Sequence, residues 1–265
     1  MTYATAADEL EIDSTRAPLL AHLVEFRNRL IWAMVSFAIC FLFSFYFAKQ
    51  IFGFLTLPLA RALAGQPNDF LIYTALYETF FTYVKVAMFA GLCLAFPVIA
   101  AQLWLFVAPG LYKKERRALL PFLVATPVLF IAGAALVFFV MLPFAIHFFL
   151  SYQTPTTNGA LGIQLQAKVS EYLDLVMTLV LAFGLTFQLP VLLSLLGRVG
   201  IITSAQLSGV RRYAYVGIVI LAAIVTPPDA FSMISLIVPL IVLYEISIGC
   251  VKLFERQRIH NEANQ

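Results

Sequence analysis

Residues 118–149 read ALLPFLVATPVLFIAGAALVFFVMLPFAIHFF, a long run that contains no Lys, Arg, Asp or Glu. A helix that crosses the hydrocarbon core of a bilayer needs about 20 predominantly apolar residues. This stretch is long enough, and as an α-helix it would satisfy its backbone hydrogen bonds internally, as lipid requires. The stretch therefore predicts a membrane protein.

The composition of the whole chain agrees with this prediction. Of its 265 residues, 62% are hydrophobic and 12% are charged, and the mean hydropathy is +0.92. A soluble domain contains about 45–50% apolar and about 25% charged residues. Long apolar runs also favour spanning helices over the alternating pattern of a membrane β-barrel. The chain is thus interpreted as a polytopic, all-α integral membrane protein.

Six segments are long or apolar enough to be candidate spans, and no internal repeat or Gly/Ser-rich linker divides them. We therefore expect a single six-helix domain over about residues 19–252. The last two candidates are short: the fifth has roughly 14 residues, which reach about 21 Å against about 30 Å of hydrocarbon, and Glu245 interrupts the sixth. The candidates lie at about 30–52, 80–107, 118–149, 172–196, 213–226 and 231–250.

The positions of Lys and Arg predict the orientation, because cytoplasmic flanks of spans carry an excess of these residues. One side carries Arg16, Arg27, Arg29, Lys113, Lys114, Arg116, Arg117, Arg198, Arg211, Arg212, Lys252, Arg256 and Arg258, and the other only Lys49, Arg61 and Lys168. Both termini are therefore expected to be cytoplasmic. Residues 1–18 are acidic and lack the apolar core of a signal peptide, so they are predicted to form a disordered tail. Residues 253–265 form a second cytoplasmic tail.

Two outer segments attract attention. The loop over about 53–79 is long and moderately apolar around Pro58, so we expect it to lie in the membrane interface as a cap on the bundle. Asp229 follows two prolines at the outer end of the fifth span. It either caps the next helix, as Asp before an apolar run often does, or takes part in function, and the residues alone leave both open.

Two short polar clusters on the predicted cytoplasmic side are the sharpest functional signal. Residues 22–29 (HLVEFRNR) precede the first span, and residues 109–117 (PGLYKKERR) follow the second. Each places one glutamate, Glu25 or Glu115, among basic residues. Two carboxylates on one face suit a ligand that carries two positive charges. The alternative is structural: Glu25 and Arg29 are spaced i,i+4 and can pair with each other, and Glu115 can neutralise its neighbours.

The sequence lacks the common enzyme signatures. It has neither the G-x-x-x-x-G-K-[ST] of a nucleotide-binding loop nor H-E-x-x-H, and its three histidines lie far apart. Cys40, Cys93 and Cys250 fall in or beside apolar spans and are interpreted as packing residues. We expect no metal, no cofactor, no nucleic-acid partner and no catalytic activity. Gln188 and Glu245 are the main polar groups expected within the spans, and intramembrane acids are functional candidates by default.

Several motifs, in order along the chain, resemble the TatC family, the polytopic subunit of the twin-arginine translocase. They are the cluster at 22–29, the stretch from Phe96-Pro97 to Arg117, Phe183-Gly184 with Phe187-Gln188-Leu189-Pro190, Thr226-Pro227-Pro228-Asp229, and Pro239 to Glu245. The resemblance covers about residues 18–255. It implies a concave, glove-like bundle of six helices in the bacterial cytoplasmic (inner) membrane.

The resemblance also implies a function. Members of the family recognise signal peptides that bear paired arginines, and with the single-span subunits TatA and TatB they export folded proteins, using the protonmotive force. A multimeric complex with TatB, in contact with membrane lipids, is expected.

The family pattern assigns site residues. The acids that face the paired arginines correspond to Glu25 and Glu115. Around these acids, we expect Arg27 and Arg29 to hold the tip and the carboxylates in place. Four further residues either shape the loop or are ordinary packing residues of the interface: Phe106, Pro109, Leu111 and Tyr112.

Gln188 departs from the family pattern, which commonly has glutamate there. Glutamine forms hydrogen bonds across helices but does not titrate, so contact with TatA or TatB helices and simple helix–helix bonding both stay open. The rival interpretation of the whole chain is a six-span secondary transporter of a small solute. It requires polar groups that converge at mid-membrane, whereas the polar residues here concentrate at the cytoplasmic edge.

Overall fold

The computed structural model describes residues 6–64, 71–107, 120–154, 161–226 and 230–263, and these parts are almost entirely helical. Within them, the β-structure consists of two isolated bridges, Ile72–Lys168 and Thr154–Ile163. The helices are α1 (Ala6–Tyr46), α2 (Ala48–Leu63), α3 (Glu78–Val107), α4 (Leu120–Leu136), the π-helix η3 (Val137–Met141), α5 (Leu142–Leu150), α6 (Val169–Thr186), α7 (Leu189–Val199), α8 (Ser204–Gly209), α9 (Arg211–Val225) and α10 (Ala230–Ala263).

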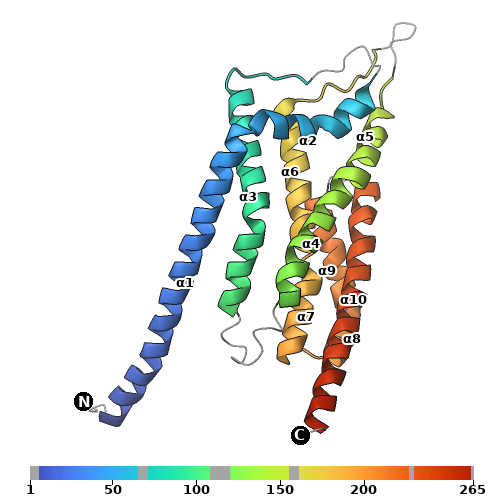
Figure 1. The fold of residues 1–265 in the computed structure, drawn as a ribbon. Coiled ribbons are helices and arrows are strands. Elements are labelled where there is room, and N and C mark those ends of the chain that lie inside the picture. The colour runs from blue at the N-terminus through green and yellow to red at the C-terminus, as the bar shows by residue number, and fades with distance from the viewer. Residues whose placement is uncertain (1–5, 65–70, 108–119, 155–160, 227–229, 264–265) are drawn as a thin grey trace, which may run out of the picture.

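The long helices run roughly along one axis, and α2 crosses one end of the bundle (Figure 1). Five helical segments are long and apolar enough to span a membrane: 23–46, 78–106, 121–150, 169–198 and 230–256. The start of α1 and the end of α10 lie at the same end of the bundle, as the distribution of Lys and Arg predicts. The protein is thus an all-α, multi-pass membrane protein.

The first span and its flanks differ from the sequence prediction. The predicted span continued to residue 52, but α1 ends at Tyr46, Phe47 has φ −97° and ψ 15°, and α2 begins at Ala48. The first part of the loop predicted over about residues 53–79 is therefore helical, because α2 continues to Leu63. Helix α1 begins at Ala6, so it includes most of the segment predicted to be a disordered tail; the Ala, Leu and Glu residues there have high helix propensity.

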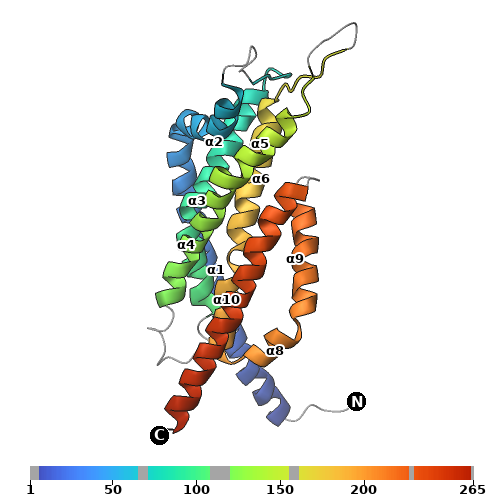
Figure 2. The same ribbon diagram turned by 90° about the vertical axis from the view of Figure 1, so that its right-hand side faces the viewer.

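The two last helices differ in length. Helix α9 has 15 residues, which reach about 22 Å, so it is short as predicted. Helix α10 is not short, because it has 34 residues and continues past Glu245. A charged residue does not end this helix because its carboxylate has partners on α9, described below. Figure 2 shows α9 beside α10, away from α1 and α2.

Proline explains two interruptions in the spans. A proline ring clashes with the carbonyl of the residue four before it and removes a hydrogen bond. The π-helix η3 lies directly before Pro143, where an extra residue in the turn absorbs this clash. Similarly, α6 ends at Thr186 and α7 begins at Leu189, next to Pro190.

Two glycines allow neighbouring helices to approach closely. A Cβ atom at Gly91 of α3 would lie 2.8 Å from the Cα atom of Phe41 in α1. A Cβ atom at Gly133 of α4 would lie 2.8 Å from the carbonyl oxygen of Phe183 in α6. Such contacts are sterically impossible, so these helix pairs depend on glycine for their backbone contact, as small residues allow in membrane bundles.

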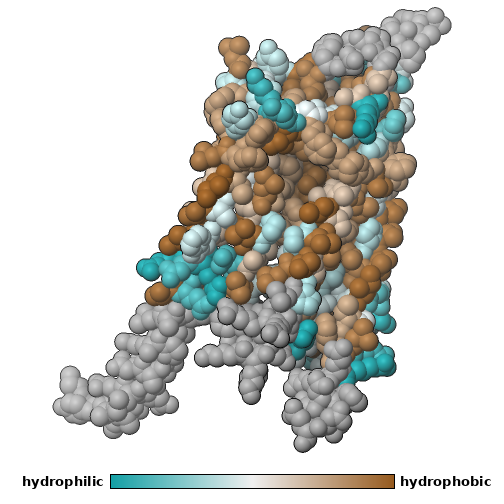
Figure 3. All heavy atoms as spheres, viewed as in Figure 1, coloured by the Kyte–Doolittle hydropathy of each residue, from teal (hydrophilic) through white to brown (hydrophobic). Residues whose placement is uncertain are grey.

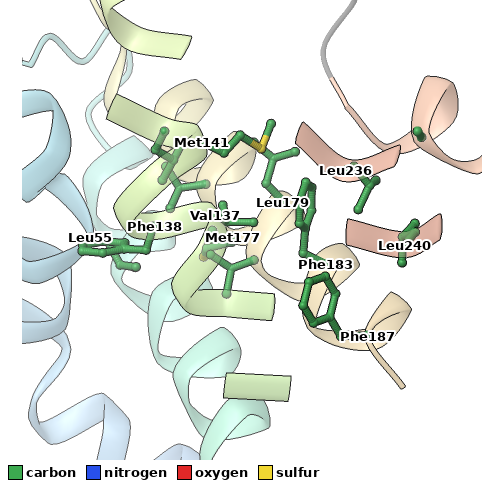
Figure 4. Packing of buried hydrophobic residues seen from close by; sticks show 14 of the residues in the cluster. Leu55, Val137, Phe138, Met141, Met177, Leu179, Phe183, Phe187, Leu236 and Leu240 are labelled. Atoms are coloured by element: carbon green, nitrogen blue, oxygen red, sulfur yellow. The ribbon is translucent and has the colours of Figure 1, made fainter. Parts of the chain in front are cut away.

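The apolar core lies where η3, α6 and α10 meet. Figure 4 shows Met141, Phe183 and Leu236, one from each of these elements, in the same cluster. All three side chains are fully buried, with 0% of their surface exposed. The cluster also reaches α2 through Leu55, which is 4% exposed. The core therefore fixes the cap relative to the spans. Apolar residues also cover most of the outer face of the bundle, with hydrophilic residues gathered towards its two ends (Figure 3), as a bilayer requires.

Candidate functional site

Glu25 lies near the middle of α1, two residues after the start of the apolar span 23–46 on the side of the termini, and it pairs with Arg29 one turn along. Arg29 Nε donates to Glu25 Oε1 over 3.0 Å, and Arg29 Nη2 donates to the same oxygen. Among the described residues, no hydrogen bond reaches the other carboxylate oxygen, Oε2. The Glu25 side chain is 35% exposed. The internal pair that the sequence left open is therefore present, and it uses half of the carboxylate.

A groove of about 630 Å³ opens beside this carboxylate. Its lining comes from α1 and from the second half of α3, and it combines apolar, amide and charged groups: Val24, Glu25, Asn28, Arg29, Trp32 and Gln102. The groove thus offers an acceptor oxygen next to aromatic and amide surface. An arginine side chain, which is planar and carries five donors, suits such a lining.

The end of α3 supports this part of α1. The rings of Phe26 and Phe106 lie 5.2 Å apart at an interplanar angle of 57°, a geometry favourable for aromatic pairs. Arg27 Nη2 donates to Asn28 Oδ1 over 3.4 Å, a long contact between exposed neighbours. The Phe106 ring therefore packs against the acidic turn of α1, whereas Arg27 bonds to its sequence neighbour. The roles predicted for these two residues stay predictions.

Several predicted site residues lie outside the described residues. Glu115, Pro109, Leu111 and Tyr112 belong to 108–119, and Asp229 belongs to 227–229. Their roles stay predictions.

Comparison with known proteins identifies the family. A family model described as "Sec-independent protein translocase protein (TatC)" matches residues 21–239. The chain belongs to the TatC family. It is 46% identical over 248 residues to TatC of Magnetococcus marinus, covering 94% of this chain and 89% of that protein, and 36% identical over 239 residues to TatC of Escherichia coli K12, covering 90% and 89%. A crystal structure of the twin-arginine translocase receptor TatC superimposes with a TM-score of 0.72 at 36% identity, covering 88% of this chain and 99% of that one.

Membership of the TatC family sets the general function. The chain is a component of the Sec-independent protein translocase of the bacterial inner membrane, and the TatC family consists of receptors rather than enzymes. The polytopic fold agrees with this assignment. Membership of the family replaces the alternative interpretation, a transporter of a small solute.

Gln188, which the sequence analysis expects to depart from the family pattern, bonds within the chain. It lies between α6 and α7, and its Nε2 donates to the Thr126 carbonyl of α4 over 3.0 Å. Thr126 Oγ1 in turn accepts from Trp104 Nε1 of α3 over 2.9 Å. Gln188 therefore joins three elements, the helix–helix bonding that the sequence left open. Contact with a partner helix stays a prediction.

Glu245 joins the last two helices. Its Oε2 accepts from Arg211 Nη2 over 2.8 Å, and its Oε1 accepts from Tyr215 OH over 2.6 Å. Tyr244 OH donates to the Leu207 carbonyl of α8 over 2.9 Å. This network ties α10 to α8 and α9 on the side of the termini, and it accounts for the acid in the span.

Pro58 lies inside α2 and is buried. Its side chain is therefore among the residues through which α2 packs on the bundle. A role on the outer side stays a prediction.

Sequence reasoning missed Glu78, the first residue of α3. Its Oε2 accepts from Thr74 N (2.9 Å), Thr74 Oγ1 (3.2 Å) and Ala75 N (3.3 Å). Its Oε1 accepts from Ser170 Oγ (2.7 Å) and Ser170 N (3.4 Å) at the start of α6. The Lys168 ammonium lies 3.9 Å away. Glu78 therefore joins the segment before α3 to the outer end of α6. Its partner Ser170 is distant in the sequence, so no local motif predicts this contact.

Sequence reasoning also missed an ion pair within the spans. Lys85 Nζ of α3 lies 3.0 Å from Asp174 Oδ1 and 2.8 Å from Oδ2 of α6. Both residues fall within predicted spans, at about 80–107 and 172–196, but the sequence alone assigned neither of them a role. The rule that intramembrane charges pair with one another predicts an acidic partner for Lys85, but only the packing of α3 against α6 identifies it as Asp174.

Proposed function

We propose that this chain is the receptor for twin-arginine signal peptides, acting through Glu25 and Glu115 on its cytoplasmic face. With TatA- and TatB-type single-span partners it exports folded proteins, using the protonmotive force. The observation that carries the proposal is the state of Glu25: it is partly exposed, it faces a groove of about 630 Å³, and among the described residues it is bonded only through Oε1.

Arg29 prepares the carboxylate for this ligand. By donating to Oε1 from one side, it holds the Glu25 side chain in a fixed orientation, with Oε2 left to accept from a second guanidinium. A peptide arginine then adds a charge-assisted hydrogen bond without breaking the internal pair. Guanidinium groups suit this arrangement better than ammonium groups, because their donors are planar and rigidly spaced.

The carboxylates provide selectivity, and apolar contact provides most of the affinity. An exposed ion pair contributes about 0.2–1 kcal/mol, too little for stable binding by two pairs alone. A signal peptide also carries an apolar segment, and its burial contributes about 25 cal/mol per Å². The apolar face of α1 and Trp32 in the groove provide a surface for such contact.

The test is binding of a twin-arginine signal peptide to membranes that contain this protein. Glu25→Gln and Glu115→Gln keep the shape of each side chain and remove its charge, so each is expected to weaken binding of the Arg-Arg peptide and to affect a Lys-Lys peptide less. Glu171→Gln is the matched control, because Glu171 is 77% exposed at the other end of the bundle; it is expected to leave binding unchanged. Equal binding by all variants would refute the proposal.

A further inference from the structure

The last turns of α3 have two faces with different neighbours. Gln102 lines the groove beside Glu25, and Phe106, four residues further along, packs on Phe26 of α1. Residues four apart share one face of a helix, so Gln102 and Phe106 together form the α3 wall of the groove. Trp104 lies between them in the sequence, and two residues correspond to more than half a turn. It therefore faces away from the groove, and it is only 6% exposed.

The face that carries Trp104 packs on α4 and α7. Phe96, Ala100 and Trp104 follow one another at intervals of four residues, so they form one stripe along α3. The Phe96 ring stacks on Phe130 of α4, with 4.1 Å between the ring centroids. A second apolar cluster, apart from the main core, consists of Ala100, Trp104, Phe122, Val191 and Leu195. This cluster supports the α3 wall from behind.

One buried hydrogen bond fixes the position of Trp104. Its indole Nε1 donates to Thr126 Oγ1 of α4 over 2.9 Å, and Thr126 is 2% exposed. An indole N–H is only a donor, so when buried it requires an acceptor. The Thr126 hydroxyl donates its own proton to the Phe122 carbonyl over 2.8 Å, which leaves its lone pairs to the indole.

The acceptor is itself held in place from another element. Gln188 Nε2, between α6 and α7, donates to the backbone carbonyl of Thr126 over 3.0 Å. Trp104 is thus bonded to a point on α4 that is fixed through both its side chain and its backbone. Such a point can anchor α3, because buried, fully bonded networks are rigid.

The α3 wall needs an anchor at this position. Helix α3 ends at Val107, and the last turn of a helix has carbonyls without partners in the helix and tends to fray. Trp104 lies three residues before that end. A guanidinium presents its donors in a rigid plane, so the groups that receive it must be held in place by packing and hydrogen bonds behind them.

We propose that Trp104 is a positioning residue for peptide recognition: its bond to Thr126 holds the α3 wall at a fixed separation from Glu25. The inference rests on the proposed function, because it takes the groove beside Glu25 as part of the peptide site. It adds a residue outside the groove that sets the geometry of the groove, and it gives the second apolar cluster a role in recognition.

The test measures binding of a fluorescent twin-arginine signal peptide to the full chain in nanodiscs, with a melting curve for each variant. Trp104→Phe keeps an aromatic ring and removes the donor, whereas Thr126→Val removes the acceptor. Thr126→Ser retains the hydroxyl and serves as the conservative variant. Tyr172→Phe is the matched control, because it removes a different buried hydrogen bond, from Tyr172 OH to the Leu55 carbonyl over 3.1 Å, near the outer end of the bundle.

Trp104→Phe and Thr126→Val are each expected to weaken binding about three- to fivefold, and no more than Glu25→Gln does, because a misplaced ion pair loses at most what an absent one loses. Thr126→Ser and Tyr172→Phe are expected to leave the affinity within about 1.5-fold, since both keep the anchor. In the Glu25→Gln background, Trp104→Phe should also change the affinity by less than about 1.5-fold, because the wall then has no carboxylate to align with.

Unchanged affinity in a folded Trp104→Phe variant overturns the inference, and if that variant does not fold, unchanged affinity in Thr126→Val overturns it equally. An equal loss in Tyr172→Phe overturns it, because affinity then follows stability alone. An equal loss with and without Glu25→Gln overturns it too, because Trp104 then acts by another route. Affinity unchanged by Glu25→Gln itself refutes the proposed function and this inference with it, whereas a loss in Glu25→Gln without one in Trp104→Phe refutes only the role of Trp104.

Discussion

Glu25 and Glu78 are two carboxylates at opposite ends of the same bundle, and their surroundings differ sharply. Glu78 is 7% exposed and accepts hydrogen bonds from two residues before it and one at the start of α6. Glu25 is 35% exposed and bonds to one arginine within its own helix. A carboxylate whose lone pairs are all used holds the fold together. A carboxylate with a free oxygen beside a groove remains available to a ligand.

The two acids also differ in how far along the chain their hydrogen-bond partners lie. The partner of Glu25 lies four residues away, so this pair forms wherever α1 is helical. The partners of Glu78 include Ser170, 92 residues along the chain, so they meet only when α3 and α6 are packed. Two backbone hydrogen bonds, Ile72 N to Ala167 O (3.1 Å) and Val169 N to Ile72 O (2.9 Å), strengthen the same junction.

The largest effect is expected from Glu78→Ala. This change leaves backbone N–H groups of Thr74, Ala75 and Ser170 without their acceptor, and unsatisfied buried donors are strongly destabilising. We expect the thermal midpoint of the detergent-solubilised protein to fall by roughly 8 °C or more, given the usual dependence of Tm on stability for chains of this size. Circular dichroism or a size-exclusion thermal assay measures it. Glu171→Ala, a change of an exposed glutamate, should leave Tm within about 2 °C; an equal loss in both variants would contradict the structural role of Glu78.

Glu25→Gln should show the opposite profile, with an effect on binding and little on folding. Loss of the carboxylate charge is expected to lower affinity for a twin-arginine peptide about fivefold, which corresponds to about 1 kcal/mol, the upper range for an exposed pair. The Tm should stay within about 2 °C of the unmodified protein. Fluorescence titration in nanodiscs and a parallel melting curve measure both quantities. A large fall in Tm with unchanged affinity would place Glu25 with Glu78 as a structural acid.

The sequence anticipated one of these acids and not the other, for a physical reason. Glu25 lies in a compact cluster of charges beside an apolar span, a pattern visible within eight residues. Glu78 stands alone at the start of a span, and its partners come from another loop. Lys85 and Asp174 are likewise far apart in the sequence, and only the packing of α3 against α6 brings them together.

The fold shows the same division between local and tertiary causes. Apolar length predicted the membrane spans, and the distribution of Lys and Arg predicted that the termini share one side. The break at Phe47 and the continuation of α10 past Glu245 depend on neighbours. Helix α2 packs on the core through Leu55, while Arg211 neutralises the charge of Glu245 and Tyr215 donates a hydrogen bond to it. No window of local sequence contains those contacts.

A smaller effect is expected from Ser170→Ala. This change removes the hydroxyl that donates to Glu78 Oε1 over 2.7 Å, but the backbone N–H of Ser170 and the bonds from Thr74 and Ala75 remain. A single hydrogen bond to a charged group contributes about 1.5–3 kcal/mol at most, so Tm should fall by roughly 3–6 °C. Combined with Glu78→Ala, it should add little, because its partner is already absent. Fully additive losses would show that Ser170 stabilises the protein independently of Glu78.

The smallest effect is expected for the coupling between Glu25 and Arg29. A double-mutant cycle with Glu25→Gln and Arg29→Gln should give about 0.3–0.5 kcal/mol of stability, the range for an i,i+4 pair on a helix surface. The coupling should shrink as salt rises, because exposed charges are screened within about 10 Å at 0.1 M. In the peptide-binding assay, however, Arg29→Gln should weaken binding in the presence of Glu25 and have no effect in the Glu25→Gln background, since Arg29 acts by orienting that carboxylate. An equal effect in both backgrounds would mean that Arg29 contacts the peptide by another route, and the pair would then be a helix-surface contact with no part in preparing the site.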